Sequence, residues 1–400
     1  MSVARRISAG LLAAALAVGA LAANASASPA PAPLRVLTLG GGPDLQHNQA
    51  AIESNVRYLD RLLPPGTAER VLFTDGRKQS RNVLCEDDRG KEYFRRPQLP
   101  RLDGPNETAA VATRFRALAS GPASGPVLLY ATGHGSPNPE TLDNSTLDLW
   151  GGGELSVRQL AAQVKTLPAS VPVTVVLVQC FSGSFGNLLF EGGDPKAPLI
   201  GRDLCGFFAS VSERPAAGCT AAVNEADYHD FTGYFFGALS GKSRLGRPVA
   251  GADYDHDGRV GMDEAFAYAL IHDDSIDTPV CTSDVFLRRF VPAPGADWAE
   301  TSWSDLRAWA TPAQRAALDA LSADLHLGGE ARLQDGYARF EKVPRSAEDL
   351  PSVRVIRLMR LARTVVLAHE LMTSGAADDQ PLKARYRALT AAEARNCLAP

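Results

Sequence analysis

In the first 240 positions of the chain, apolar residues form short continuous runs that are separated by segments with helical spacing. Continuous apolar runs are typical of strands buried on both faces of a parallel sheet, because helices then cover both faces. The run at 173–178 stops abruptly at Gln179-Cys180. The strands predicted in this way are 34–39, 69–74, 127–131, 173–178 and 218–223.

Helices are predicted between these strands, where apolar residues recur at intervals of three or four. Ser156 and Gln159 form a capping box that begins one of them. The other predicted helices start near Asn48 and cover 108–118 and 231–239, whereas 77–106 and 186–203 are interpreted as loops and 147–153 as a hairpin. The alternation of strands and helices predicts an α/β fold with a mostly parallel sheet flanked by helices.

The pattern changes near residue 292, beyond which no strand is predicted. A helix is predicted to begin at Pro312, with Thr311 and Gln314 as its capping pair. We therefore predict a separate all-helical region at 296–400. A long helix at 352–373 has an arginine at every third position, and this basic face is either solvated or docks on an acidic partner or on the rest of the protein. Its arginines are Arg354, Arg357, Arg360 and Arg363.

The first 27 residues have the pattern of an export signal. Two arginines precede an apolar stretch at 10–23, and an Ala-Ser-Ala sequence at 25–27 fits a cleavage site. The apolar stretch is shorter than the ~20 residues of a membrane-spanning helix, so a cleaved signal is favoured over an anchor. We expect a secreted or periplasmic protein with no membrane contact after cleavage, and a main domain at 28–295.

Net charge and cysteine content narrow the expected partners and environment. The net charge is −4, which argues against nucleic acid as a partner because phosphate binding needs a basic surface. The six cysteines would meet an oxidising compartment after export. Cys205 and Cys219 flank a short loop and are the first candidates for a disulfide.

The chemistry is predicted to centre on Cys180, because open α/β sheets form ligand crevices at the carboxyl ends of their strands. His134-Gly135 follows the strand at 127–131, and parallel strands bring both segments to one edge of the sheet. A thiol nucleophile needs a base and an oxyanion site. His134 is the candidate base, and the N–H groups of Gly135 and Cys180 are the candidate oxyanion donors. The small Ser182 and Gly183 leave the sulfur accessible.

Two segments resemble the motifs of the caspase-like (clan CD) cysteine peptidases, most closely those of the legumain (C13) family. They are 128–136 (LLYATGHGS), which carries His134, and 178–183 (VQCFSG), which carries Cys180. The similarity spans about residues 34–239. It implies a caspase–haemoglobinase α/β fold in which Cys180 is the nucleophile, His134 the general acid and base, and Gly135 an oxyanion donor.

The sequence departs from legumains around the substrate pocket. Gly41 stands where legumains carry the asparagine that orients the histidine, and His47 stands where they carry a pocket arginine. A preference for asparagine is therefore not inferred from the resemblance. The candidate pocket residues are His47, together with Glu225 and Asp227, whose carboxylates would favour a basic P1 side chain.

A second candidate site is 253–264 (DYDHDGRVGMDE), which has the spacing of an EF-hand calcium loop. Carboxylates stand at loop positions 1, 3 and 5, glycine at 6 and glutamate at 12. The alternative is an acidic surface turn. Gly246 and Pro248 disfavour a helix before the loop, so we expect an EF-hand-like half site with a structural role. The predicted Ca²⁺ ligands are Asp253, Asp255, Asp257, the carbonyl of Arg259, and Glu264.

Together these residues predict an exported, calcium-binding cysteine endopeptidase that acts on peptides or proteins through a thioacyl intermediate, or a transpeptidase that uses the same intermediate. The alternative is a catalytically inactive caspase-like module that binds a peptide or a partner. A serine hydrolase based on Ser182 or Ser184 is less favoured, since no Gly-x-Ser-x-Gly sequence supports it. By analogy with the legumain prosegment, 296–400 is a candidate intramolecular regulatory region that covers the active site until it is cleaved.

Overall fold

The computed structural model describes residues 32–120, 125–292 and 296–399. The predicted export signal at 1–27 lies outside the described residues. Within the described ranges, no helix is both long enough and apolar enough to cross a membrane.

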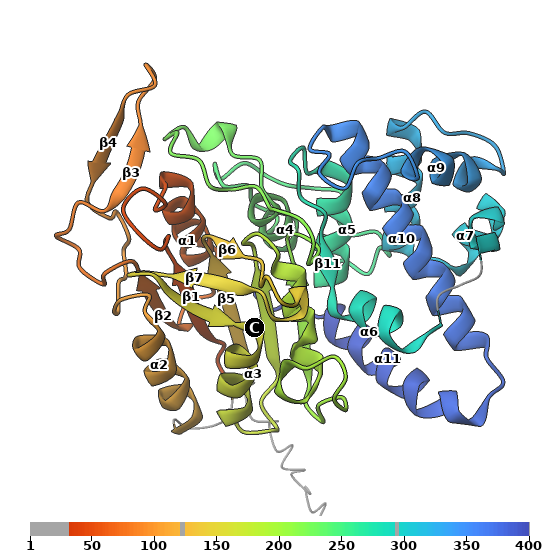
Figure 1. Ribbon diagram of the computed structural model, residues 1–400, viewed down its shortest axis with the longest axis horizontal. Helices are drawn as coiled ribbons and strands as arrows, with labels where there is room; N and C mark the ends of the chain where they lie inside the picture. The colour runs from red at the N-terminus through yellow and green to blue at the C-terminus, as the bar shows by residue number, and fades with distance from the viewer. Residues whose placement is uncertain (1–31, 121–124, 293–295, 400) are drawn as a thin grey trace, which may run out of the picture. The chain divides into compact units, whose positions relative to one another are not determined.

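A six-stranded sheet forms the centre of the fold (Figure 1). Its strands, in spatial order, are β11 (Val280–Cys281), β10 (Leu204–Phe208), β9 (Val173–Leu177), β5 (Val127–Thr132), β1 (Arg35–Gly40) and β2 (Ala68–Phe73). All neighbours are parallel except the short β11, which runs antiparallel to β10. This arrangement confirms the predicted α/β fold with a mostly parallel sheet flanked by helices.

Helices cover both faces of the sheet, which explains why its central strands are apolar without alternation. Leu129 and Val175 face a core that includes α2, α3 and α6, whereas Tyr130 and Val176 face a core that includes α1, α4 and α5. Ser156 and Gln159 form the predicted capping box of α3. These helices are α1 (Ala50–Leu62), α2 (Thr108–Ser120), α3 (Val157–Thr166), α4 (Phe231–Ser240), α5 (Met262–His272) and α6 (Thr282–Phe290).

Two strand predictions need correction. The sequence pattern misses β10, because this strand is only five residues long and Gly206 interrupts its apolar run. Residues 218–223, predicted as a strand, form no strand and make one isolated bridge, between Ala222 and Glu86. The strand beside β9 is instead β10, and 218–223 lie outside the central sheet.

Small β elements lie outside the central sheet. Residues 77–106, predicted as a loop, contain the hairpin β3 (Val83–Glu86) and β4 (Glu92–Arg95), which stands at the upper left of Figure 1. The hairpin predicted at 147–153 is present as β7 (Thr146–Leu149) and β8 (Gly153–Ser156). Its partner is β6 (Gly135–Ser136), which follows His134 directly.

From Ala296 onward, the described residues form helices and no strand. These helices gather on the right of Figure 1. Thr311 and Gln314 form the predicted capping box at the start of α8. The α-helices of this region are α7 (Trp303–Trp309), α8 (Pro312–Asp324), α9 (Arg332–Phe340), α10 (Leu350–Thr373) and α11 (Gln380–Glu393).

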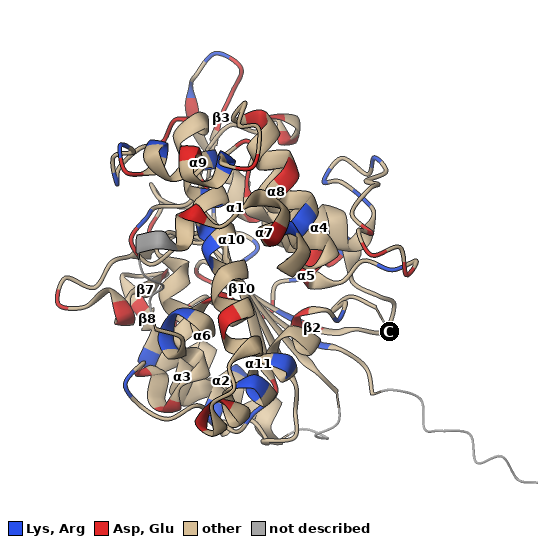
Figure 2. Cartoon of the chain, turned by 90° about the vertical axis from the view of Figure 1, so that its right-hand side faces the viewer, with Lys and Arg blue, Asp and Glu red and all other residues tan. Residues whose placement is uncertain are grey.

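The basic face of α10 packs against the α/β part of the chain. The Arg357 side chain is buried, and its guanidinium donates to the backbone carbonyls of Asp273 (2.6 Å) and Asp277 (2.8 Å). Arg360 pairs with Asp284 at 3.1 Å. Figure 2 shows acidic and basic residues interspersed along the ribbon on this side of the molecule. Arg357 and Arg360 thus dock on the rest of the protein, which is one of the interpretations of this basic face.

Candidate active site

The candidate nucleophile lies where the sheet ends. Cys180 follows β9 by three positions, and Phe181 adopts the left-handed conformation (φ 58°) that turns the chain away from the strand. The thiol is half-buried, and the backbone N–H of Ala216 donates to its Sγ at 3.3 Å. The sulfur therefore lies between the end of β9 and the segment that follows β10.

His134-Gly135 reaches the same edge because β5 and β9 are parallel neighbours, with Ala131 beside Leu177. A Cβ on Gly135 would lie only 2.4 Å from the Cys180 carbonyl oxygen, so the two segments touch and any side chain at 135 would clash. The backbone N–H of Cys180 makes no hydrogen bond among the described residues. This N–H is a candidate donor to a developing oxyanion beside the sulfur.

The His134 ring is oriented by a residue that the sequence did not suggest. Its Nε2 lies 2.9 Å from Oε1 of Gln49, the residue that begins α1. The ring also meets the His47 ring edge to face, with 5.4 Å between the centroids. Within the described residues, no hydrogen bond joins His134 to Cys180. Gln49 is thus the hydrogen-bond partner of the His134 ring.

Cys180 and His134 are both held in their neutral forms. Burial raises the pKa of the Cys180 thiol, and the Ala216 N–H opposes that rise only in part. Burial lowers the pKa of His134, and the nearby His47 lowers it further. Both pKa shifts favour the uncharged forms, so a thiolate–imidazolium pair forms only when the thiol proton is transferred.

This neutral resting state predicts how Cys180 reacts with an alkylating reagent. Only the thiolate reacts, so we expect slow carbamidomethylation at pH 7 and a rate that rises with pH. The midpoint should lie above the ~8.5 of an unperturbed cysteine. Mass spectrometry of the Cys180 peptide, after iodoacetamide treatment between about pH 6 and 10, measures it. A midpoint below about 7 would show a preformed thiolate–imidazolium pair and contradict this description.

Gln179 is a second residue that the motif did not single out. Its side chain is 1% exposed, and neither Oε1 nor Nε2 has a hydrogen-bond partner among the described residues. A Cβ on Gly135 would lie 2.6 Å from the Gln179 Cγ, so the amide lies beside the oxyanion segment. An unpaired buried amide costs about 1–3 kcal/mol. The only sequence signal is a polar residue that ends an apolar run.

The predicted pocket residues already have partners. His47 lies 2.8 Å from the Asp44 carboxylate and is exposed. Glu225 accepts from Ser54 at 2.8 Å and pairs with Arg57, so its charge is balanced within the protein. Asp227 is exposed and accepts from the side chain of Asn224, its neighbour in the same turn. Of these three, His47 is the one in contact with the candidate catalytic histidine.

All six cysteines are free thiols, so the suggested Cys205–Cys219 disulfide is wrong for this structure. Cys205 lies on β10, where its Sγ contacts the Ala392 carbonyl of α11. The Cys219 thiol instead contacts the Gly133 carbonyl, beside the candidate site. Cys205 and Cys219 do not flank a short loop, because Cys205 belongs to β10 and is buried in the core. Ser182 and Ser184 are buried, which argues against the serine-hydrolase hypothesis.

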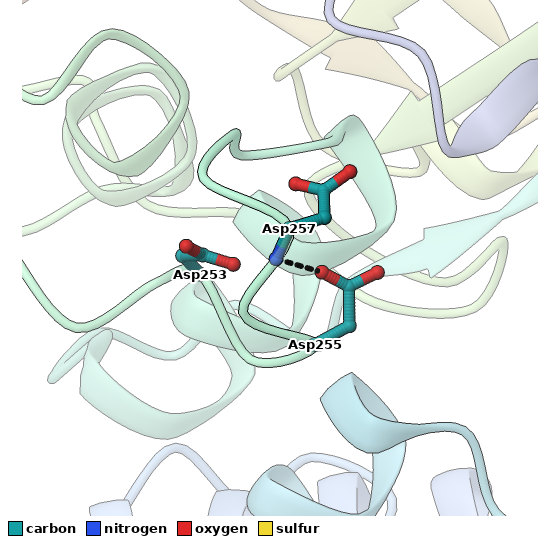
Figure 3. A group of neighbouring side chains, drawn as sticks. All are labelled: Asp253, Asp255 and Asp257. Carbon is teal, nitrogen blue, oxygen red and sulfur yellow. Dashed lines mark hydrogen bonds between the residues drawn. The ribbon is translucent and has the colours of Figure 1, made fainter.

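The 253–264 segment folds into a tight acidic loop (Figure 3). One carboxylate oxygen from each of Asp253, Asp255 and Asp257 lies within 4.8 Å of the others. Asp253 Oδ2 accepts from the Gly258 N–H at 3.1 Å, whereas its buried Oδ1 has no hydrogen-bond partner among the described residues. Glu264 is 6% exposed, and its carboxylate accepts from loop N–H groups.

Three of the predicted ligands fit a calcium ion, because the carboxylate oxygens of Asp253, Asp255 and Asp257 converge and Asp253 Oδ1 has no hydrogen-bond partner among the described residues. Glu264 does not belong to this group, since both of its carboxylate oxygens accept from loop N–H groups. Helix α5 leaves the loop, and residues 242–261 before it contain no helix. The acidic group is exposed on one side, so the loop has access to solvent ions.

No protein-family description and no curated protein matches this chain. Protein GSU0716 from Geobacter sulfurreducens is a solved structure with 14% identity and a TM-score of 0.35, and the match covers 62% of this chain and 92% of that one. A secreted C11 cysteine protease from Bacteroides thetaiotaomicron has 9% identity and a TM-score of 0.29, with 70% and 71% covered. Both scores are below 0.5, so function is argued below from the residues of this chain.

Proposed function

We propose that the protein is an exported cysteine endopeptidase with a caspase-like Cys-His site. The observation that carries this proposal is the contact between Gly135 and the backbone of Cys180, at the edge where β5 and β9 end together. This contact brings together a thiol, an imidazole-bearing segment and the backbone N–H groups of Gly135 and Cys180. These are the groups that acyl transfer through a thioester requires.

The proposed reaction begins when a substrate carbonyl approaches the Cys180 sulfur. The thiol proton passes to His134, whose ring turns from Gln49 toward the sulfur, and the S–C bond forms. The carbonyl oxygen becomes an oxyanion that the N–H groups of Cys180 and Gly135 stabilise. The C–N bond then breaks, and His134 gives its proton to the leaving amine. Water attacks the thioester with His134 as base, which releases the carboxylic acid and restores the thiol.

The test is turnover of a peptide library that varies the P1 residue among Asn, Arg, Lys and Asp. Cleavage after any of these P1 residues supports a peptidase and identifies its P1 preference. Glu225 is neutralised by Arg57, so the structure gives no reason to expect a strict basic preference. An absence of turnover across the library, with calcium present, would reject the proposed activity.

The second candidate function is a non-catalytic module that binds a peptide or a protein partner. One observation favours it: His134 is hydrogen-bonded to Gln49, with no bond to Cys180 among the described residues. In free enzymes catalytic hydrogen bonds are often long and tighten only with substrate, so this geometry is compatible with either function. Peptide binding without turnover in the library experiment would support the module.

We propose Ca²⁺ as a structural ion held by Asp253, Asp255, Asp257, the Arg259 carbonyl and Glu264. Extracellular sites of this type bind in the 10⁻⁴–10⁻³ M range, so about 10 mM Ca²⁺ should stabilise the fold by about 1–3 kcal/mol over EDTA. Urea unfolding with and without the ion measures the difference. Asp253→Ala should abolish it, whereas Asp88→Ala, an exposed carboxylate of the β3–β4 turn, should leave it unchanged. Equal calcium effects in the two variants would reject the site.

A further inference from the structure

The sulfur of Cys180 rests against one loop, which we name the cradle segment (Val211–Ala217). It follows β10 and carries the Ala216 N–H that donates to the Cys180 Sγ at 3.3 Å. The cradle segment also binds the residue after Cys180: the Phe181 N–H donates to the Arg214 carbonyl at 3.0 Å. A Cβ on Gly183 would lie 2.8 Å from the Val211 Cα, so the two segments are closely packed.

The cradle segment has no regular secondary structure, so side-chain anchors contribute to its position alongside these backbone contacts. Arg214 is 5% exposed, and its guanidinium points into the loop between α9 and α10. Its two terminal nitrogens donate to the carbonyls of Arg345 (2.6 Å) and Ala347 (2.5 Å). These carbonyls belong to the helical region, far from the nucleophile along the chain. A buried guanidinium with two carbonyl acceptors thus ties that region to the cradle.

A second anchor holds the other end of the cradle. The Ala217 N–H donates to Asp277 Oδ1 at 2.6 Å, and the second oxygen of this fully buried carboxylate accepts from the Phe231 N–H. Arg357 of α10 in turn donates to the Asp277 carbonyl at 2.8 Å. Two arginine contacts, one at Arg214 and one at Arg357, therefore connect the helical region to the segment that contacts the thiol.

We propose that Arg214 is a positioning residue, through which the C-terminal helical region holds the Ala216 N–H against the Cys180 sulfur. This inference rests on the proposed function, and it gives the helical region a supporting role in place of the removable cover suggested by the legumain resemblance. The two roles have opposite consequences. Loosening a cover would raise activity, whereas loosening a support would lower it.

The test compares Arg214→Met with Arg202→Met in the full-length protein. Arg202 is a matched control, because it is also buried and donates to a backbone carbonyl, that of Leu167, away from the site. The Ala216 N–H stabilises the Cys180 thiolate by donating to the sulfur. Arg214→Met should lose this hydrogen bond and so disfavour the thiolate. We therefore expect the pH midpoint of Cys180 alkylation to rise by about one unit, the size of one charge-assisted hydrogen bond, and amide exchange in 211–217 to accelerate. Arg202→Met should change neither.

Peptide hydrolysis provides a separate measurement. In Arg214→Met, kcat should fall about 10-fold or more with a smaller change in KM, and Arg214→Lys, which keeps one donor, should lie between it and the wild type. If Arg214→Met does not fold, the lysine variant carries both readouts. Alkylation and exchange need no turnover, so they test Arg214 even if the wild type proves not to be a peptidase. An unchanged midpoint and unchanged exchange in a folded Arg214 variant would overturn the inference, as would a gain in activity.

Discussion

Replacing Cys180 with alanine is expected to reduce peptide hydrolysis by on the order of 10⁴-fold or more. No other thiol can replace it, because the sulfur must lie within bonding reach of both the scissile carbonyl and the base. Cys180 is half-buried at the end of β9, beside the Gly135 backbone. The measurement is kcat/KM with whichever P1 peptide the library identifies, together with circular dichroism to show that the fold is retained.

Cys219→Ala is the matched control for this prediction. Its thiol lies beside the site, in contact with the Gly133 carbonyl, yet burial raises its pKa far above the range in which a thiolate forms. Activity should therefore stay within a few fold of the wild type. His134→Ala should lose nearly as much activity as Cys180→Ala, and the double variant should lose no more, because the two groups act as a unit. If activity survived in Cys180→Ala and vanished in Cys219→Ala, the nucleophile would be Cys219, and the assignment to Cys180 would be wrong.

The sequence pattern predicts the central strands because each is a continuous apolar run between turn residues. It also brings His134 and Cys180 to one edge of the sheet, since parallel neighbours end together. It misses β10, whose run is short and contains Gly206. A strand missed in this way also hides the start of the cradle segment, which β10 positions.

The orienting groups of the site could not be predicted for a different reason. Gln49 reaches His134 from the N-cap position of α1, and the Ala216 N–H is a backbone group that every residue but proline has. Their roles arise only from packing between distant segments. No local pattern distinguishes such a glutamine or such an amide from any other.

The arginine spacing on α10 could be predicted only in part. It predicts a basic face, but it does not reveal that the most buried of these arginines binds backbone carbonyl oxygens as well as an acidic side chain. Arg357 donates to the carbonyls of Asp273, Ser275 and Asp277, and its guanidinium lies 3.8 Å from the Asp273 carboxylate. One side chain therefore organises the whole turn after α5. This turn includes Asp277, whose carboxylate binds the Ala217 N–H of the cradle segment.

Arg357→Met is expected to lower the free energy of unfolding by about 3–5 kcal/mol, because it leaves the buried carboxylate of Asp273 without its cation and several carbonyls without donors. The Arg357 and Asp273 side chains are both fully buried, so water cannot take over these contacts. Burial raises the pKa of Asp273 and the Arg357 charge opposes the rise. In the variant this pKa should rise further. The loss of stability should therefore be smaller at a pH where Asp273 is protonated in the folded wild type and variant alike, and it should grow as the pH rises and Asp273 ionises in the folded wild type.

Urea denaturation at about pH 5 and pH 8 measures both the loss and its pH dependence. Arg363→Met is the control on the same face of α10, since Arg363 makes no hydrogen bond or ion pair that joins it to the α/β part among the described residues, and its replacement should cost less than about 0.5 kcal/mol. Arg357→Met should also accelerate amide exchange at Ala217, whose N–H is bound by the Asp277 side chain. Equal costs for the two variants would mean that the face is held by apolar packing of α10 alone, and that Arg357 is no anchor for the turn or the cradle.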